Sequence, residues 1–158
     1  MAGNNKTTMM IFSGDMDKIF AAFTVATGAA ASGMDVTMFF TFWGLKAIQK
    51  GNLTGDGFLG KMIGLMNRGG IERIGPSRLN FGGIGRGLFK KMMKDKRVVG
   101  LTELRDTALD LDVKFYACKT SMDVMEIKES DLIPGVCGLM GVAGYIKEAS
   151  ESEITLFI

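Results

Sequence analysis

The chain has 158 residues, with 19 lysine and arginine residues against 17 aspartate and glutamate residues, and it contains no histidine. Ser-His-Asp and Cys-His catalysis and histidine-ligated metal sites are therefore excluded from within this chain. A hydrophobic content of 47% and a mean hydropathy of +0.20 favour a sheet buried on both faces, or an oligomer that covers further apolar surface. Two cysteines and no secretory signal after Met1 predict a reducing, cytoplasmic location.

The residues expected to form secondary structure alternate between strand and helix patterns along the chain. Residues 7–12 form a short apolar run, and residues 17–32 predict a helix that ends at Gly33. The helical run is uncharged from Ile19 to Met34, but it is too short and too weakly apolar to span a membrane, so we expect it to pack on a sheet. Residues 35–43 are rich in β-branched and aromatic side chains and predict a central strand, followed by a short helix at 44–49.

After an irregular middle, the second half repeats this alternation. Residues 101–110 predict a helix with Thr102 as its cap, and the later strands are expected at 113–117, 136–139 and 154–158, with helices from Ser121 and at 140–149 between them. Five strands alternating with helices predict one domain over residues 1–158, a three-layer α/β/α sandwich with a five-stranded parallel sheet. Ligands then bind at the carboxyl ends of the strands, where Ser13-Gly14, Cys118 and Cys137 are expected to gather.

The middle of the chain, at about 51–97, differs in charge and composition from its surroundings. Residues 61–97 hold ten basic residues and two acidic ones, a local charge of +8 in a chain whose total is +2, and the segment is rich in glycine and methionine. This segregation predicts an insertion that acts as a mobile lid or docks an acidic partner or an anionic membrane surface. Nucleic acid is not favoured as a partner, because the segment has few aromatic residues and no recognised binding motif.

Cys118 is the first candidate for chemistry. The strand at 113–117 leads it into a turn before a helix, where exposed peptide N–H groups can stabilise a thiolate. Thr120 and Asp123 resemble a capping box that would fix the helix start, and Thr120 and Ser121 support the anion. Lys119 favours the thiolate whereas Asp123 opposes it, which leaves the direction of the pKa shift of Cys118 open at this stage. The alternative is that Cys118 is a buried and unreactive cysteine of the core.

Three other features of the sequence bear on function. Cys137 is either buried filler or a second thiol that resolves a disulfide with Cys118. Ser13 and Gly14 after the first strand are an anion candidate, although Asp15 would repel an anion. The glycine-rich stretch from Gly82 to Gly87 follows no convincing strand and lacks the Gly-Lys-Ser/Thr ending of a phosphate loop.

The segments FYACKTSMDVMEI and LIPGVCGLMGVAGYIKEA resemble the DsrE/DsrF/DsrH-like family, in particular its branch of sulfurtransferases also described as peroxiredoxin-like. The most specific part is the Cys-x-x-Ser-Met-Asp-x-Met motif that begins at Cys118. The resemblance implies that Cys118 carries sulfur as a persulfide, in a five-stranded fold that assembles into oligomers. Two positions depart from the pattern: Glu126 stands where a glycine is expected, and Cys137 falls where no fixed cysteine is expected.

The sequence thus predicts a sulfur carrier or sulfurtransferase that needs no cofactor and no metal, with sulfur-donor and sulfur-acceptor proteins as partners. Two alternatives stay open. One is a non-catalytic module that docks on a membrane or a membrane complex through residues 61–97, and the other is a thiol redox protein that uses Cys118 and Cys137 as a reversible pair.

Overall fold

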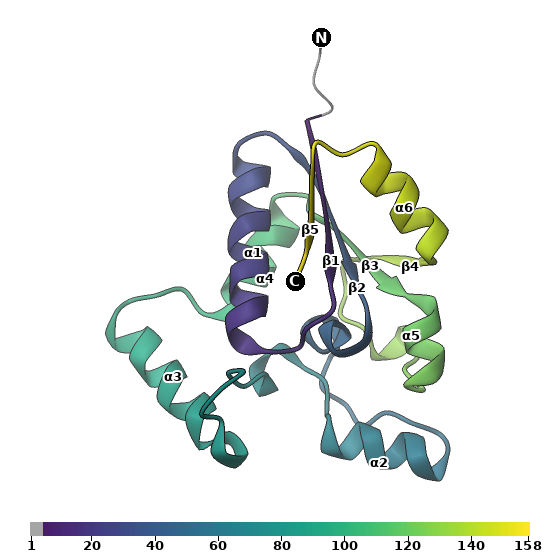
Figure 1. The fold of residues 1–158 in the computed structure, drawn as a ribbon. Coiled ribbons are helices and arrows are strands. Elements are labelled where there is room, and N and C mark those ends of the chain that lie inside the picture. The colour runs from purple at the N-terminus through teal and green to yellow at the C-terminus, as the bar shows by residue number, and fades with distance from the viewer. Residues whose placement is uncertain (1–4) are drawn as a thin grey trace.

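The computed structural model describes residues 5–158 and contains the predicted five-stranded parallel sheet (Figure 1). The strands lie in the order β4-β3-β2-β1-β5, and every neighbouring pair is parallel. Their bounds are β1 (Lys6–Ile11), β2 (Asp35–Phe40), β3 (Lys114–Cys118), β4 (Val136–Met140) and β5 (Ile154–Phe157). Parallel order places the carboxyl ends of all five strands at one edge, which is the lower edge in Figure 1.

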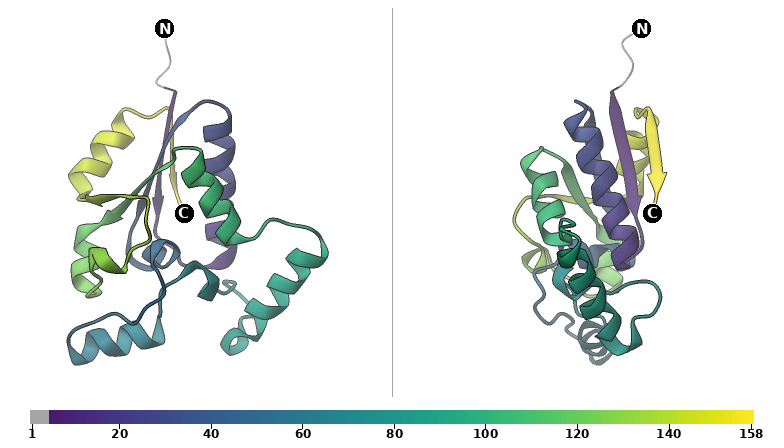
Figure 2. Two further views of the ribbon diagram at one scale, coloured as in Figure 1. Left: turned by 180° about the vertical axis from the view of Figure 1, so that it is seen from behind. Right: turned by 90° about the vertical axis from the view of Figure 1, so that its left-hand side faces the viewer.

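Helices cover both faces of the sheet, as the predicted sandwich requires (Figure 2). The long helix α1 (Met16–Ala31) packs beside α4 (Leu101–Asp110) on one face, while α5 (Lys119–Val124) and the α6 helix (Val142–Ser150) lie on the other. The helix that the sequence places at 101–110 is therefore confirmed. Its cap position is held by Gly100 rather than Thr102, whose hydroxyl instead donates to the carboxylate of Glu72.

Aromatic side chains join the layers on either face of β2. Phe40 points toward α1, and the centroid of its ring lies 6.2 Å from that of Phe23 in α1. It also lies 5.2 Å from the ring centroid of Phe115 in the neighbouring strand β3. The preceding residue, Phe39, points to the opposite face and stacks on Tyr145 of α6 at 5.3 Å. Successive residues of a strand alternate between faces, so an unbroken apolar run serves two cores at once, which confirms β2 as a central strand.

The strand predicted at 35–43 ends earlier than its sequence suggests. Phe42 has a positive φ of 45°, and a 3-10 helix, η1 (Phe42–Ile48), follows at once. No side chain fits at Gly44, because a Cβ there would lie 2.1 Å from the carbonyl oxygen of Ile11. The loop after β2 is thus packed directly on the end of β1.

The predicted irregular middle contains helices of its own. These are α2 (Phe58–Met66), the short turns η2 (Ile71–Arg73) and η3 (Phe81–Gly83), and α3 (Ile84–Asp95); a further turn, η4 (Glu129–Asp131), precedes β4. Figure 1 shows α2 and α3 beyond the carboxyl edge of the sheet, outside the three layers. The glycine-rich stretch from Gly82 to Gly87 spans the end of η3 and the start of α3, and it follows no strand. Within residues 5–158, no helix combines the length and apolar character that a bilayer crossing requires.

Candidate functional site

Cys118 is the last residue of β3 and lies immediately before α5, at the carboxyl edge where the sequence places it. Its side chain is half-buried. Ala117 pairs with Phe40 in the parallel register of β3 and β2, so Cys118 lies level with the residue that follows β2, which is Thr41. The site is therefore made by the ends of two strands that are distant in sequence.

Hydrogen-bond donors of Thr41, Thr120 and Ser121 lie close enough to the sulfur of Cys118 to influence its pKa. The hydroxyl groups of Thr41 and Ser121 are buried and share a hydrogen bond, with their oxygen atoms 2.8 Å apart. Burial is the largest single influence on the pKa of Cys118 and raises it, but the hydroxyl and N–H of Ser121, the hydroxyl of Thr41 and the N–H of Thr120 together bring the pKa below its ordinary value. The structure thus decides the direction that the sequence leaves open, and it favours the reactive thiolate.

The ammonium of Lys119 does not take the predicted role of supporting the Cys118 thiolate. It forms an ion pair with Asp123 at 3.4 Å, and both side chains are more than 60% exposed. An exposed pair of this kind is screened by water and contributes little. The predicted capping box is also absent, because the helix begins at Lys119 with Cys118 at its cap position and no side-chain capping bond. Thr120 contributes its peptide N–H instead of a cap.

Ser13 and Gly14 lie at the carboxyl end of β1, and β2 separates them from Cys118 in the sheet. The Ser13 hydroxyl donates to Asp15 at 3.1 Å, and no hydrogen bond among residues 5–158 joins Ser13 or Gly14 to the Cys118 loop. They line a separate polar cavity. The carboxyl edge thus carries two distinct groups of polar residues.

Cys137 is exposed and stands second in β4, so the expectation that both cysteines end their strands is wrong for this residue. The residue level with Cys118 is Met140, three positions further along β4. At about 3.3 Å of rise per residue this offset amounts to about 10 Å, whereas a disulfide needs Cα atoms within about 7 Å. The geometry opposes a direct disulfide between the two thiols.

The contacts of Glu126 account for the presence of glutamate where the family pattern has glycine. Its φ is 52°, the left-handed conformation that glycine adopts most easily. Its carboxylate accepts hydrogen bonds from the N–H groups of Asp56 at 2.5 Å and Gly57 at 2.8 Å, just ahead of α2. Lys128 adds an ion pair with Asp56 at 2.9 Å. The segment that follows α5 therefore holds the two residues that precede α2, a contact that no local feature of the sequence predicts.

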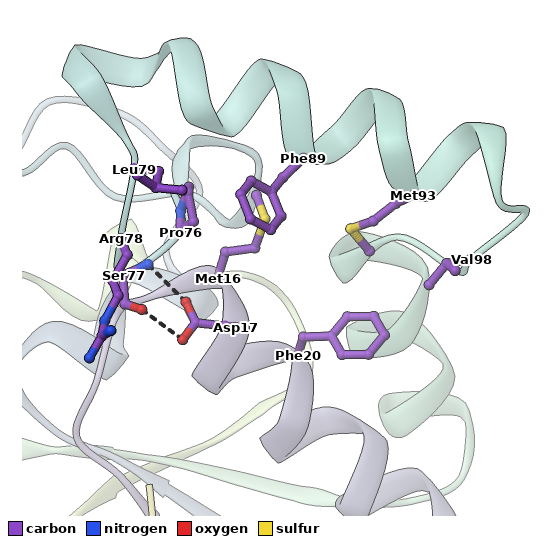
Figure 3. Close-up of a pocket in the computed structure, with 10 residues that line it drawn as sticks. All are labelled: Met16, Asp17, Phe20, Pro76, Ser77, Arg78, Leu79, Phe89, Met93 and Val98. Carbon is purple, nitrogen blue, oxygen red and sulfur yellow. Dashed lines mark hydrogen bonds between the residues drawn. The ribbon is translucent and has the colours of Figure 1, made fainter.

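A second, apolar hollow lies between α1 and α3 (Figure 3). It has a volume of about 460 Å³ and is walled by Met16, Phe20, Leu79, Phe89, Met93 and Val98. At one end, the carboxylate of Asp17 accepts hydrogen bonds from the N–H and hydroxyl of Ser77, both at 2.8 Å. These bonds fix the loop that leads toward α3. The Ser77 hydroxyl and the Asp17 carboxylate at this end of the hollow are engaged with each other.

Metal chemistry finds no support in the arrangement of acidic and sulfur side chains. No group of three or more cysteine, aspartate or glutamate residues within residues 5–158 is placed to hold a metal ion. The thiol site thus consists of one sulfur and its hydrogen-bond donors.

Comparisons with known proteins agree with this fold and place the chain in a family. Residues 3–157 match the model of the DsrE/DsrF/DrsH-like family. The chain is 41% identical to the uncharacterized protein YrkE of Bacillus subtilis over 155 residues, covering 97% of this chain and 96% of that protein. It is 30% identical to the sulfur carrier protein DsrE2 of Allochromatium vinosum over 156 residues, covering 97% and 98% of the two chains.

Two solved structures share the fold at low sequence identity. The YchN protein from E. coli aligns with a TM-score of 0.58 at 13% identity, covering 97% of this chain and 99% of YchN. The protein MTH1491 from Methanobacterium thermoautotrophicum aligns with a TM-score of 0.55 at 11% identity, covering 97% and 98%. Since the family match spans nearly the whole sequence, the chain belongs to the DsrE/DsrF/DrsH-like family.

Proposed function

We propose that this protein is a sulfur carrier that accepts sulfane sulfur on Cys118 and passes it to a partner thiol. The observation that carries the proposal is the Cys118 site itself, a half-buried thiol whose pKa is lowered by two hydroxyl groups and two peptide N–H groups. The relationship to a sulfur carrier that is 30% identical over nearly the full length of both chains supports it.

The transfer needs no base and no net oxidant. The Cys118 thiolate attacks the terminal sulfur of a donor persulfide, a new S–S bond forms on Cys118, and the donor S–S bond breaks and releases the donor thiolate. The thiolate of an acceptor then attacks the same terminal sulfur, which restores the Cys118 thiolate. Thr41 and Ser121 can stabilise the anion at the start and end of this cycle, which suits a chain without histidine.

Mass spectrometry of the intact protein tests this proposal directly. Incubation with a small persulfide donor should add the mass of one sulfur atom to the wild type and to Cys137→Ala, and nothing to Cys118→Ala. Addition of an acceptor thiol should remove the added mass. A wild type that stays unmodified, or a Cys118→Ala variant that loads equally well, would refute the assignment.

The basic segment at residues 61–97 is suited to binding an acidic partner protein. Its ten basic residues between 61 and 97 lie on α2, η2 and α3 and in the loops around them, and α2 and α3 lie beyond the same edge that carries Cys118. Opposite charge speeds encounter and orients partners more than it adds to final affinity. Sulfur transfer to an acidic partner should therefore slow steeply with added salt, while loading from an uncharged small donor should not.

Self-association is supported by an aromatic cluster at the carboxyl edge. The ring of Phe12 packs 5.8 Å from Phe42 and 5.9 Å from Phe157 between centroids, and all three side chains are at least 39% exposed. A contiguous apolar group on the surface is typical of an interface. Light scattering should show a smaller assembly for Phe157→Ser than for the wild type; a wild type that is monomeric at all concentrations would count against self-association.

A membrane-docking role is the second candidate, and the surface of α2 favours it. Five of its nine residues are exposed and apolar, namely Phe58, Leu59, Met62, Leu65 and Met66. An apolar helix surface with basic neighbours is suited to the interface of an anionic bilayer. Vesicles with anionic lipid should bind the wild type and Cys118→Ala equally and bind Phe58→Ser weakly. Absence of binding at low salt would remove this candidate.

A further inference from the structure

A polar cavity of about 270 Å³ opens at the carboxyl end of β1, beside the first turn of α1. Its walls come from five separate segments of the chain, and they include Ser13, Lys46, Asn67, Arg73 and Asn80. Cys118 does not line it, and β2 lies between β1 and β3 in the sheet. The cavity is thus separate from the proposed sulfur-transfer site.

Lys46 is the central cation of this cavity. Its side chain is half-buried, and its ammonium donates a hydrogen bond to Oδ1 of Asn67 at 3.2 Å. No ion pair within residues 5–158 involves Lys46. Burial lowers the pKa of Lys46, and the positive charges of Arg86 and Arg73 lower it further, against an opposing influence of Asp15. A partly desolvated cation among other cations is unfavourable until an anion joins it.

Two arginines extend the positive charge. Arg73 lines the cavity, and Nη1 of Arg86 donates to the carbonyl oxygen of Arg73 at 3.0 Å. Neither guanidinium takes part in an ion pair among the residues that the structure describes. Guanidinium groups bind oxyanions through paired N–H donors. Arg73 is the one that lines the cavity, while the charge of Arg86 acts on Lys46 from outside the lining.

Asp15 also lines the polar cavity, and its negative charge is balanced by the ammonium of Lys18. Its Oδ2 accepts a hydrogen bond from the Ser13 hydroxyl at 3.1 Å and pairs with the Lys18 ammonium at 3.0 Å. The cavity therefore keeps an excess of positive charge, to which the positive end of the 16-residue helix α1 adds.

Two glycines keep the cavity walls close. A Cβ at Gly14 would lie 2.5 Å from the carbonyl oxygen of Trp43, and one at Gly75 would lie 2.7 Å from the side-chain amide of Asn80. The loops can approach this closely only because these positions lack side chains. The amide groups of Asn67 and Asn80 and the cations Lys46 and Arg73 are thereby gathered around one space.

We propose that this cavity binds a small tetrahedral oxyanion of the size of sulfate, thiosulfate or inorganic phosphate. Such an ion supplies the missing negative charge beside Lys46 and accepts several hydrogen bonds at once, which a chloride ion does less well. The site does not depend on Cys118, so it stands or falls separately from the sulfur-carrier function.

Calorimetric titration tests the proposal with sulfate, thiosulfate and phosphate in turn, at an ionic strength held constant with chloride. Wild type and Cys118→Ala should bind at least one of the three saturably, with a dissociation constant of the order of 1 mM or below. Lys46→Met should weaken binding at least tenfold. The matched control, Lys91→Met, removes one exposed lysine of α3 and should change binding less than twofold.

Thermal unfolding separates a lost ligand contact from a damaged fold. Without added oxyanion, the melting temperature of Lys46→Met should be no lower than that of the wild type. The substitution removes a partly buried cation that has no ion-pair partner in the described part of the chain. If Lys46→Met fails to fold, the exposed Arg73→Gln decides by the same tenfold criterion. Absence of saturable binding by all three ions, or equal weakening in Lys46→Met and Lys91→Met, would overturn the proposal.

Discussion

Removal of the two hydroxyl groups beside Cys118 should change how its reactivity depends on pH. Thr41→Val and Ser121→Ala each delete one member of the hydroxyl pair whose oxygen atoms lie 2.8 Å apart. Either hydroxyl left alone is released from its partner and can turn fully to the sulfur. We therefore expect a small effect of each single substitution and a larger effect of the double substitution than the sum of the two.

The size of the effect follows from the energy of one hydrogen bond to an anion. Such bonds contribute about 1.5–3 kcal/mol, and water can replace part of this at a half-buried sulfur, which points to the lower end. A loss of about 1.4 kcal/mol lowers the thiolate fraction about tenfold at pH values below the pKa. A more basic thiolate is about threefold more nucleophilic, since the Brønsted coefficient for attack on disulfides is about 0.4–0.5.

The pH profiles of the wild type and the double variant should therefore cross. At low pH the double variant should react about threefold more slowly with a small disulfide reagent, and at high pH, where both thiols are ionised, about threefold faster. Stopped-flow rates measured in a Cys137→Ala background give this comparison for a single thiol. Lys119→Met is the control, and its profile should stay within about twofold of the wild type because its ion pair is exposed.

Two results would refute this account of the site. Profiles of wild type and double variant that coincide would mean that the hydroxyl groups do not stabilise the thiolate. A larger change in Lys119→Met than in the double variant would mean that the long-range charge of Lys119 sets the reactivity instead.

Three further predictions concern stability. The pKa of Cys118 is lower in the native state than in the unfolded state, so between these two values the native state binds fewer protons. The free energy of unfolding of the wild type, relative to that of Cys118→Ala, should therefore rise with pH through this window. Denaturant titrations that give a constant difference between the two proteins would contradict the lowered pKa. Glu126→Ala should raise the hydrogen-exchange rates of residues 56–66 about tenfold, because two N–H groups lose a charged acceptor, whereas the exposed Glu129→Ala should leave those rates unchanged. Phe115→Ala should lower the free energy of unfolding by about 3–5 kcal/mol, since Phe115 is 0% exposed, while Phe58→Ala, 83% exposed, should change it by less than about 0.5 kcal/mol; equal losses in the two would show that the aromatic core is misplaced.

The centre of the sheet could be predicted from the sequence because β1 and β2 are largely buried on both faces. Mostly apolar runs such as residues 36–40 have few other stable arrangements, and the alternation with helices leaves a parallel sheet as the solution. The sequence does not predict α2 and α3, for two different reasons. Most apolar side chains of α2 are exposed, so burial does not impose the amphipathic pattern on which sequence interpretation depends. α3 begins inside the glycine-rich stretch, and glycine is unfavourable within a helix.

The thiol site could be predicted only where its residues are neighbours in sequence. Cys118 and Ser121 belong to one turn, whereas Thr41 reaches them through the register of β2 and β3, which a sequence without known pairing does not reveal. Sequence proximity also misled in one case. Lys119 follows the cysteine directly, yet its ammonium pairs with Asp123 toward solvent.

The segment that begins at Thr41 and continues through η1 explains why the thiol site can exist before any ligand arrives. Gly44 within η1 is packed against the carbonyl oxygen of Ile11, so this segment has little freedom to shift. It places Thr41 beside Cys118 and Lys46 in the wall of the polar cavity. Donors fixed in this way lose little entropy when an anion forms or binds, which is the requirement for stabilising a thiolate. The residues just before α2, by contrast, are held through exposed contacts of Glu126 and Lys128, so water competes with these contacts and constrains the helix less than packing constrains Thr41.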